Sequence, residues 1–187
     1  MIDTTTINLP GYHFREQLYE GTRTLVYRGQ QDSNGQAVVI KVLRNKYPTF
    51  SELIQFRNQY TITKNLDISG IVRPLALKSF GNGYGLIMAD EGYVSLQEWL
   101  WGDGEMGRWG AREFLDIAVQ LAEILHRLYQ NRVIHKDIKP ANILIHPEIK
   151  QVKLIDFSIS SLLPKEQQEI QNPNILEGIL PVCSGEM

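Results

Sequence analysis

The chain has 187 residues, of which 43% are hydrophobic and 21% are charged, a composition ordinary for a globular protein of one large domain or two lobes. Its formal net charge of −2 argues against a nucleic-acid partner. The opening residues lack the basic and apolar regions of a signal peptide, and the absence of any apolar run long enough to span a bilayer argues against a membrane partner. The one cysteine, Cys183, excludes a disulfide framework and fits a reducing, cytoplasmic setting.

Three strands are predicted at the start of the chain. Strand-like runs cover residues 12–19, 24–29 and 37–43, and two turns separate them. The second turn contains the pair Asn34-Gly35, which is typical of β-hairpins. Two successive hairpins predict a three-stranded antiparallel meander.

Lys41 lies inside the third predicted strand, directly after Val38-Val39-Ile40. An ammonium group buried in such a strand requires a partner, because desolvation of an unpaired charge is costly. The alternative is a lysine at a strand edge whose amino group reaches solvent. The strand alone leaves both interpretations open.

A helix is predicted over residues 48–66. Thr49 and Glu52 form the spacing of a capping box, and apolar residues recur on one face, namely Leu53, Phe56, Tyr60, Ile62 and Leu66. Two further strands are predicted over residues 71–77 and 84–88, with a glycine turn between them.

The second half of the chain is predicted to be more helical. Ser95 can cap a short helix that ends at Trp101, and a glycine-rich loop covers residues 102–110. Residues 111–130 form a strongly amphipathic helix with an apolar stripe of Phe114, Ile117, Ala118, Leu121, Leu125 and Leu128.

The most informative stretch, residues 133–158, reads VIHKDIKPANILIHPEIKQVKLIDFS. Strand-like runs over 142–145 and 152–155 flank a turn-prone segment, so a hairpin would bring Asn142 and Asp156 to the same end. An amide and a carboxylate held close together, with Asp137 nearby, suit a hard cation that prefers oxygen ligands. Magnesium carrying a nucleotide phosphate is the natural occupant.

The segments HKDIKPANIL and IDFS resemble the catalytic and metal-binding segment of eukaryotic-type serine/threonine protein kinases, whose pattern is H-R-D-x-K-x-x-N followed by D-F-G. The resemblance implies that Asp137 is the base for the substrate hydroxyl and that Lys139 contacts the transferred phosphate. It also implies that Asn142 and Asp156 are the magnesium ligands. The implied cofactors are ATP and Mg²⁺, and the implied partner is a protein substrate with a Ser or Thr hydroxyl.

The same resemblance assigns the nucleotide contacts. The turn after the first strand resembles the phosphate-covering loop, Lys41 would hold the α- and β-phosphates, and residues 89–92 would be the hinge whose backbone reads the adenine edge. The implied cofactor-binding residues are Leu18, Gly21, Val26, Lys41, Met88, Asp90, Glu91, Asn142 and Asp156.

Several positions depart from the kinase pattern. Gln59 stands where kinases place the glutamate that pairs with the strand lysine, with Glu52 as an alternative partner for Lys41. Tyr19 replaces a glycine of the phosphate-covering loop, and Ser158 replaces the glycine of D-F-G. Lys136 replaces an arginine that usually pairs with a phosphate on the activation segment, so switching by phosphorylation of that segment is in doubt.

The expected fold is therefore α+β and two-lobed. The first lobe, residues 1–88, combines an antiparallel sheet with one helix, residues 89–92 form the hinge, and residues 93–187 form a helical, incomplete second lobe that ends at the activation segment. The expected function is ATP- and Mg²⁺-dependent serine/threonine protein kinase activity in signal transduction. The alternative is a pseudokinase-type module that binds a nucleotide or a partner with little turnover.

The strongest likeness within the kinase family is to the N-terminal kinase-like module of large cyanobacterial multidomain signalling kinases. The stretches that carry it include GTRTLVYRG and IDFSIS. We therefore expect the 187 residues to be a fragment with covalent downstream domains. Residues 165–174 would continue the activation segment, and residues 184–186 would end it.

Overall fold

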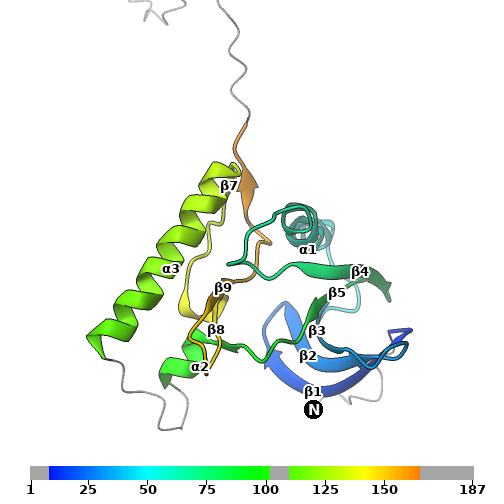
Figure 1. The fold of residues 1–187 in the computed structure, drawn as a ribbon. Helices are drawn as coiled ribbons and strands as arrows, with labels where there is room; N and C mark the ends of the chain where they lie inside the picture. The colour runs from blue at the N-terminus through cyan, green and yellow to red at the C-terminus, as the bar shows by residue number, and fades with distance from the viewer. Residues whose placement is uncertain (1–8, 102–109, 165–187) are drawn as a thin grey trace, which may run out of the picture.

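The structure, a computed structural model, describes residues 9–101 and 110–164 (Figure 1). The first lobe is built on a five-stranded antiparallel sheet in the order β1-β2-β3-β5-β4. Its strands are β1 (Tyr12–Glu20), β2 (Thr24–Gln31), β3 (Ala37–Leu43), β4 (Pro74–Phe80) and β5 (Gly83–Ala89). The predicted meander of the first three strands is confirmed, and β5 extends it on the far side of β3.

The two faces of this sheet carry different side chains, because side chains alternate along a strand. Val38, Ile40 and Val42 of β3 are fully buried in a cluster on one face. Lys41 points to the other face, where its cross-strand neighbours are Val26 and Leu86. The sheet therefore presents a single lysine among apolar neighbours on the face that α1 covers.

Helix α1 (Phe50–Thr63) begins at the predicted capping box. Glu52 N donates to Thr49 Oγ1 at 3.3 Å and Thr49 N donates to Glu52 Oε2 at 2.7 Å. These bonds satisfy amide groups that an uncapped helix leaves without partners. Phe56 anchors the helix to the sheet in a buried cluster with Leu86 and Met88.

The predicted strand over 71–77 is displaced in the structure, since β4 begins only at Pro74. The preceding residues instead pair with the second lobe. Ile71 forms an isolated parallel bridge with Leu154, whose N–H donates to Gly70 O at 2.8 Å and whose carbonyl accepts from Val72 N at 3.1 Å. A tertiary contact between the lobes therefore overrides the local strand signal.

The second lobe contains α2 (Leu96–Trp101) and α3 (Ala111–Gln130), the latter with its predicted bounds. Its short strands are β6 (Val94–Ser95), β7 (Val133–Ile134), β8 (Ile143–Ile145), β9 (Val152–Leu154) and β10 (Ser161–Leu162). The β8–β9 hairpin lies between α3 and the sheet of the first lobe (Figure 1). The expected two-lobed α+β fold is confirmed, with one helix on the first-lobe sheet and a helical second lobe.

Helix α3 is only partly covered by the elements that the structure describes. Ile117, Ile124 and Leu128 are buried in the core of the second lobe, and Ile124 was not part of the predicted stripe. Phe114 of the stripe is instead more than half exposed.

Among the described helices, none is long and apolar enough to cross a membrane. Residues 102–109 of the predicted loop at 102–110, the expected activation segment from residue 165 and Cys183 lie outside the described residues.

Candidate active site

The predicted catalytic loop places three side chains in one hydrogen-bonded group. Asp137 Oδ2 accepts from Lys139 Nζ at 2.7 Å and from Asn142 Nδ2 at 2.8 Å. Asn142 Nδ2 also donates to the Asp137 carbonyl at 2.9 Å. A single 3-10 turn, Pro140–Asn142, brings Asn142 back to Asp137. Because both neighbours donate to one oxygen, the Asp137 carboxylate is held in a fixed orientation.

His135 stabilises this loop through hydrogen bonds and through packing of its ring. Its Nδ1 accepts from the Asp137 N–H at 3.2 Å, its Nε2 lies 2.9 Å from the Ile155 carbonyl, and its ring meets Phe157 edge to face at 4.6 Å between centroids. These contacts define a neutral imidazole protonated on Nε2. Burial lowers the pKa of His135 and so favours that neutral form, although the Ile155 bond opposes the shift.

The predicted hairpin brings Asn142 and Asp156 to its same end. β8 pairs with β9, and Ile155 N donates to Asn142 O at 3.0 Å. Asp156 has a backbone φ of 65°, a left-handed conformation that strains a residue with a Cβ atom. The backbone pairing of β8 with β9 therefore brings the two residues to the same end of the hairpin, as predicted.

These two residues fit a magnesium ion. The Asp156 Oδ1 atom is buried and receives no hydrogen bond, and it lies 3.0 Å from the positively charged Lys41 Nζ, as expected of a carboxylate oxygen that attracts a cation. In residues 9–101 and 110–164 no group of three or more His, Cys, Asp or Glu side chains forms a dedicated metal cage. Magnesium in proteins commonly has one or two side-chain ligands and completes its shell with phosphates and water.

Lys41 of the first lobe forms an ion pair with Asp156 of the second lobe. Its Nζ lies 3.0 Å from Asp156 Oδ1, within ion-pair distance although outside hydrogen-bond geometry, and 3.1 Å from Gln59 Oε1. Burial by itself would raise the pKa of Asp156. Lys41 outweighs that effect, together with bonds from Ser158, so the pKa lies below its usual value.

The alternatives for Lys41 are thereby decided. Lys41 is only 8% exposed, so the interpretation as a solvent-reaching lysine is wrong. Gln59 lies beside it as predicted, whereas Glu52 is committed to the cap of α1. Asp156, which the sequence analysis did not consider as a partner for Lys41, supplies the charge that Gln59 lacks.

The side chains of Asp90 and Glu91 hold the connection between β5 and β6. Asp90 Oδ2 accepts from Arg28 Nε at 2.6 Å, and Asp90 Oδ1 accepts from Gly92 N at 3.2 Å. Glu91 forms an ion pair with Lys153 of β9. These carboxylates are therefore engaged within the protein. Neither Arg28 nor Lys153 stood out in the sequence.

The remaining predicted nucleotide contacts lie on the first-lobe sheet. Val26 is the cross-strand neighbour of Lys41, and Met88 is buried beneath α1. Leu18 and Gly21 lie at the β1–β2 turn, where a Cβ atom at Gly21 would come within 2.7 Å of Tyr19 Cε1. Tyr19 follows a register shift in β1 and folds its ring over Gly21. The loop thus carries an aromatic side chain where the kinase pattern has glycine.

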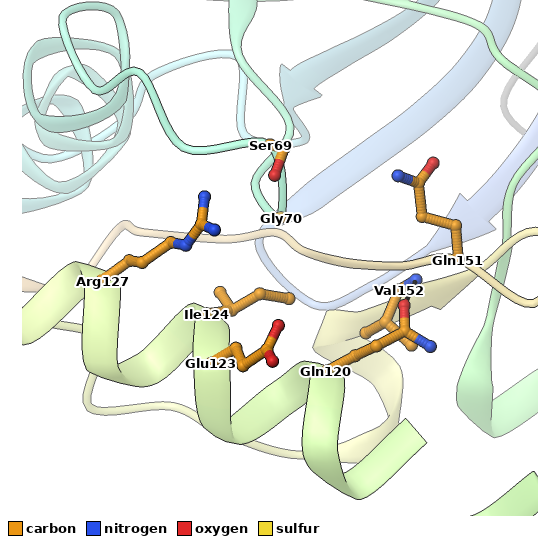
Figure 2. Close-up of a pocket in the computed structure, with 8 residues that line it drawn as sticks. All are labelled: Ser69, Gly70, Gln120, Glu123, Ile124, Arg127, Gln151 and Val152. Atoms are coloured by element: carbon orange, nitrogen blue, oxygen red, sulfur yellow. Dashed lines mark hydrogen bonds between the residues drawn. The ribbon is translucent and has the colours of Figure 1, made fainter. Parts of the chain in front are cut away.

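A separate pocket lies between α3, β9 and the loop before β4 (Figure 2). Its lining residues are Ser69, Gly70, Gln120, Glu123, Ile124, Arg127, Gln151 and Val152. Gln120 bridges Lys150 O and Val152 N at 3.0 Å each, so part of the polar lining supports the hairpin. None of the predicted site residues lines this pocket, so the hydrogen-bonded group around Asp137 is the better guide to the site.

Comparison with known proteins agrees with this geometry. A two-lobed fold with a fixed aspartate, a neighbouring lysine and a hairpin-held asparagine and aspartate defines a phosphoryl-transfer type of site. Residues 12–176 match the protein kinase domain family, and the chain belongs to that family.

Its relatives include serine/threonine kinases from bacteria and plants. The chain is 30% identical over 139 residues to serine/threonine-protein kinase PrkC of Bacillus subtilis. The matched region covers 74% of this chain and 21% of that protein. It is 32% identical over 150 residues to serine/threonine-protein kinase TIO of Arabidopsis thaliana, covering 80% of this chain and 11% of that protein. A probable serine/threonine-protein kinase of Clostridium acetobutylicum is 25% identical over 161 residues, covering 86% and 24%. The chain therefore spans a quarter or less of the length of these relatives.

Proposed function

We propose that this protein kinase domain transfers the γ-phosphate of ATP to a serine or threonine hydroxyl of a protein substrate, with Mg²⁺ as cofactor. The observation that carries the proposal is the Asp137 carboxylate, whose Oδ2 accepts hydrogen bonds from Lys139 and Asn142. A carboxylate fixed in this way can orient a hydroxyl group and accept its proton.

Each neighbouring residue then has a role. The Lys139 ammonium, whose Nζ lies 2.7 Å from Asp137 Oδ2, neutralises charge on the transferred phosphate. The hydrogen bond that it donates to Asp137 raises the pKa of Lys139 and keeps it protonated. Asp156 and Asn142 hold the metal ion, which when bound supplies positive charge to the phosphates. Lys41 holds the α- and β-phosphates after it has separated from Asp156.

The adenine-binding part of the proposed site uses mainly apolar surface. Val26 and Met88 line it from the sheet, and Leu18 and Gly21 cover it from the β1–β2 turn. Asp90 and Glu91 contribute backbone groups, since their side chains are held by Arg28 and Lys153. An adenine ring needs no charged side chain in such a pocket.

A second function is favoured by one specific observation. Gln59 offers Lys41 a neutral partner, so Lys41 pairs with Asp156, the proposed metal ligand. A protein that keeps this pair intact would hold nucleotide weakly and turn over slowly. It would act as a pseudokinase-type binding module.

The finer assignments are proposals as well. Residues 1–88, 89–92 and 93–187 would be the first lobe, the hinge and part of the second lobe. The domain would work in cytoplasmic signal transduction as part of a longer protein, of the kind found in cyanobacterial multidomain kinases. The length of the curated relatives, of which this chain spans a quarter or less, supports the proposal of a longer protein.

The test is phosphoryl transfer from γ-labelled ATP to generic protein substrates by the whole chain. Asp137→Asn should lower the turnover rate by about 10²–10⁴-fold, because it removes the proton acceptor. Asp116→Asn, the same change at an exposed position of α3, should leave the rate unchanged. A wild-type rate in Asp137→Asn would refute the base assignment. Nucleotide binding without transfer by the wild type would favour the binding module.

A further inference from the structure

Asn58 of α1 connects the helix to the segment that follows Asp156. Its Nδ2 donates to Ser158 O at 3.2 Å and to Ser160 O at 3.0 Å. One NH₂ group has two hydrogens, so both are used on two backbone carbonyls about a hundred residues away in the sequence. The adjacent Gln59 meets Lys41, because consecutive helix residues point in different directions.

The carbonyls that Asn58 holds belong to a turn fastened to the catalytic loop. Ser160 is buried, its N–H donates to Phe157 O at 3.2 Å, and its Oγ donates to His135 O at 2.9 Å. His135 in turn accepts from the Asp137 amide. Asn58 therefore joins α1 to the same network that carries Asp137.

Asp156 lies between two anchored segments. On its N-terminal side, Ile155 is bonded through its N–H to Asn142 O and through its carbonyl to His135 Nε2. On its C-terminal side, Asn58 holds the backbone at Ser158 and Ser160. A strained φ of 65° persists only where the surroundings fix the backbone on both sides.

We propose that Asn58 is a positioning residue for Asp156: its amide group fixes the backbone that aims the proposed magnesium ligand. This role rests on the proposed function, because it assigns Asp156 to the metal. Both bonds are between neutral groups, so we expect the contact between α1 and this segment to depend little on salt concentration.

The test compares Asn58→Asp with Asn65→Asp in the whole chain. The first change keeps the side-chain size and removes both donors, whereas Asn65 is exposed beyond the end of α1 and serves as the matched control. Asn58→Ala, which adds no charge, replaces Asn58→Asp should that variant fail to fold.

Two readouts are needed. Hydrogen exchange at the Ser160 amide should become about tenfold faster or more in Asn58→Asp, because both hydrogen bonds that hold this segment to α1 are lost. Amides of β3 and β5 should keep their wild-type exchange rates. The factor by which Mg²⁺ improves binding of a non-hydrolysable ATP analogue should fall about tenfold, while the Mg²⁺-free affinity stays within about twofold. Asn65→Asp should match the wild type in both measurements.

Unchanged exchange at Ser160 would overturn the proposal, because the contact between α1 and this segment would not exist in solution. Faster exchange with an unaltered Mg²⁺ factor would also overturn it, since Asn58 would then be structural only. Both outcomes presuppose a Mg²⁺ effect in the wild type and leave the proposed function intact. A wild-type chain without any Mg²⁺ effect would instead contradict the proposed function, and the role of Asn58 with it.

Discussion

Lys41 Nζ lies 3.0 Å from Asp156 Oδ1, so the proposed phosphate-binding lysine and the proposed metal ligand neutralise each other directly. Both side chains are largely removed from solvent, because the exposed fraction of the side chain alone is 10% for Lys41 and 28% for Asp156. This burial strengthens their attraction relative to a surface pair. Gln59, on the other side of Lys41, offers only an amide oxygen. Under the proposed function, binding of Mg²⁺ and nucleotide would therefore redistribute these contacts.

Replacement of Gln59 by glutamate should free Asp156. A charge-assisted hydrogen bond contributes roughly 1.5–3 kcal/mol, against about 1 kcal/mol for a neutral one, so Glu at this position should draw Lys41 toward α1. The Mg²⁺-dependent affinity for an ATP analogue should then rise about fivefold, measured by calorimetry, and turnover should rise with it.

The control for this prediction is Gln59→Met, which keeps the volume and removes the amide oxygen. In this variant the Asp156 carboxylate no longer competes with residue 59 for Lys41. The Mg²⁺-dependent affinity for the ATP analogue should therefore fall. A fall in affinity for Gln59→Glu, with the fold intact by circular dichroism, would count against competition between Asp156 and residue 59 for Lys41.

Acid should destabilise the protein through His135. Burial lowers the pKa of His135 in the folded state, whereas the unfolded chain has the usual value of 6.5. Below that value the unfolded chain binds a proton that the folded protein does not. The contribution of His135 to the free energy of unfolding therefore has its full value above pH 6.5. It decreases as the pH drops toward the lowered folded-state pKa, by at most about 1.4 kcal/mol per pH unit.

Urea unfolding at several pH values between 7.5 and 5.5 measures this dependence. His135→Gln retains a polar side chain without the titration, so its free energy of unfolding should depend less steeply on pH than that of the wild type. The same slope in both proteins would show that His135 does not remain neutral when folded.

Asp90→Ala tests the role of the carboxylate in the proposed hinge. Arg28 is 38% exposed, so loss of its bond to Asp90 should cost only about 0.5–1 kcal/mol, and nucleotide affinity should fall about two- to fivefold. ATP and GTP should be affected equally, because the carboxylate shapes the backbone and does not read the base. Glu16→Ala, at the other partner of Arg28, should leave both affinities unchanged. A selective loss of ATP binding would show that Asp90 contacts the adenine.

The sequence was sufficient where the signal is local. The turn pair Asn34-Gly35, the Thr49–Glu52 cap and the amphipathic period of residues 111–130 each predicted an element that the structure contains. The grouping of Asp137 with Asn142 was predictable for the same reason, since five residues and one turn connect them.

Contacts between distant segments were not predictable in this way. Ile71 leaves its expected strand to pair with Leu154, and Asn58 reaches backbone carbonyls that carry no side-chain signal. Arg28 lies 62 residues from Asp90, and nothing in the intervening pattern relates the two. These positions are defined by how the lobes meet, which periodicity and motif spacing do not encode.

The most direct test of the account is the effect of Mg²⁺ on nucleotide binding in three proteins, measured by titration calorimetry with a non-hydrolysable ATP analogue. The wild type should bind more tightly with Mg²⁺ than without it. Asp156→Asn should lose that gain, because it removes the proposed metal-binding charge, whereas Asp137→Asn should keep most of it, since Asp137 acts on the acceptor hydroxyl. Equal binding by the wild type with and without Mg²⁺, or a full Mg²⁺ gain in Asp156→Asn, would contradict the central claim.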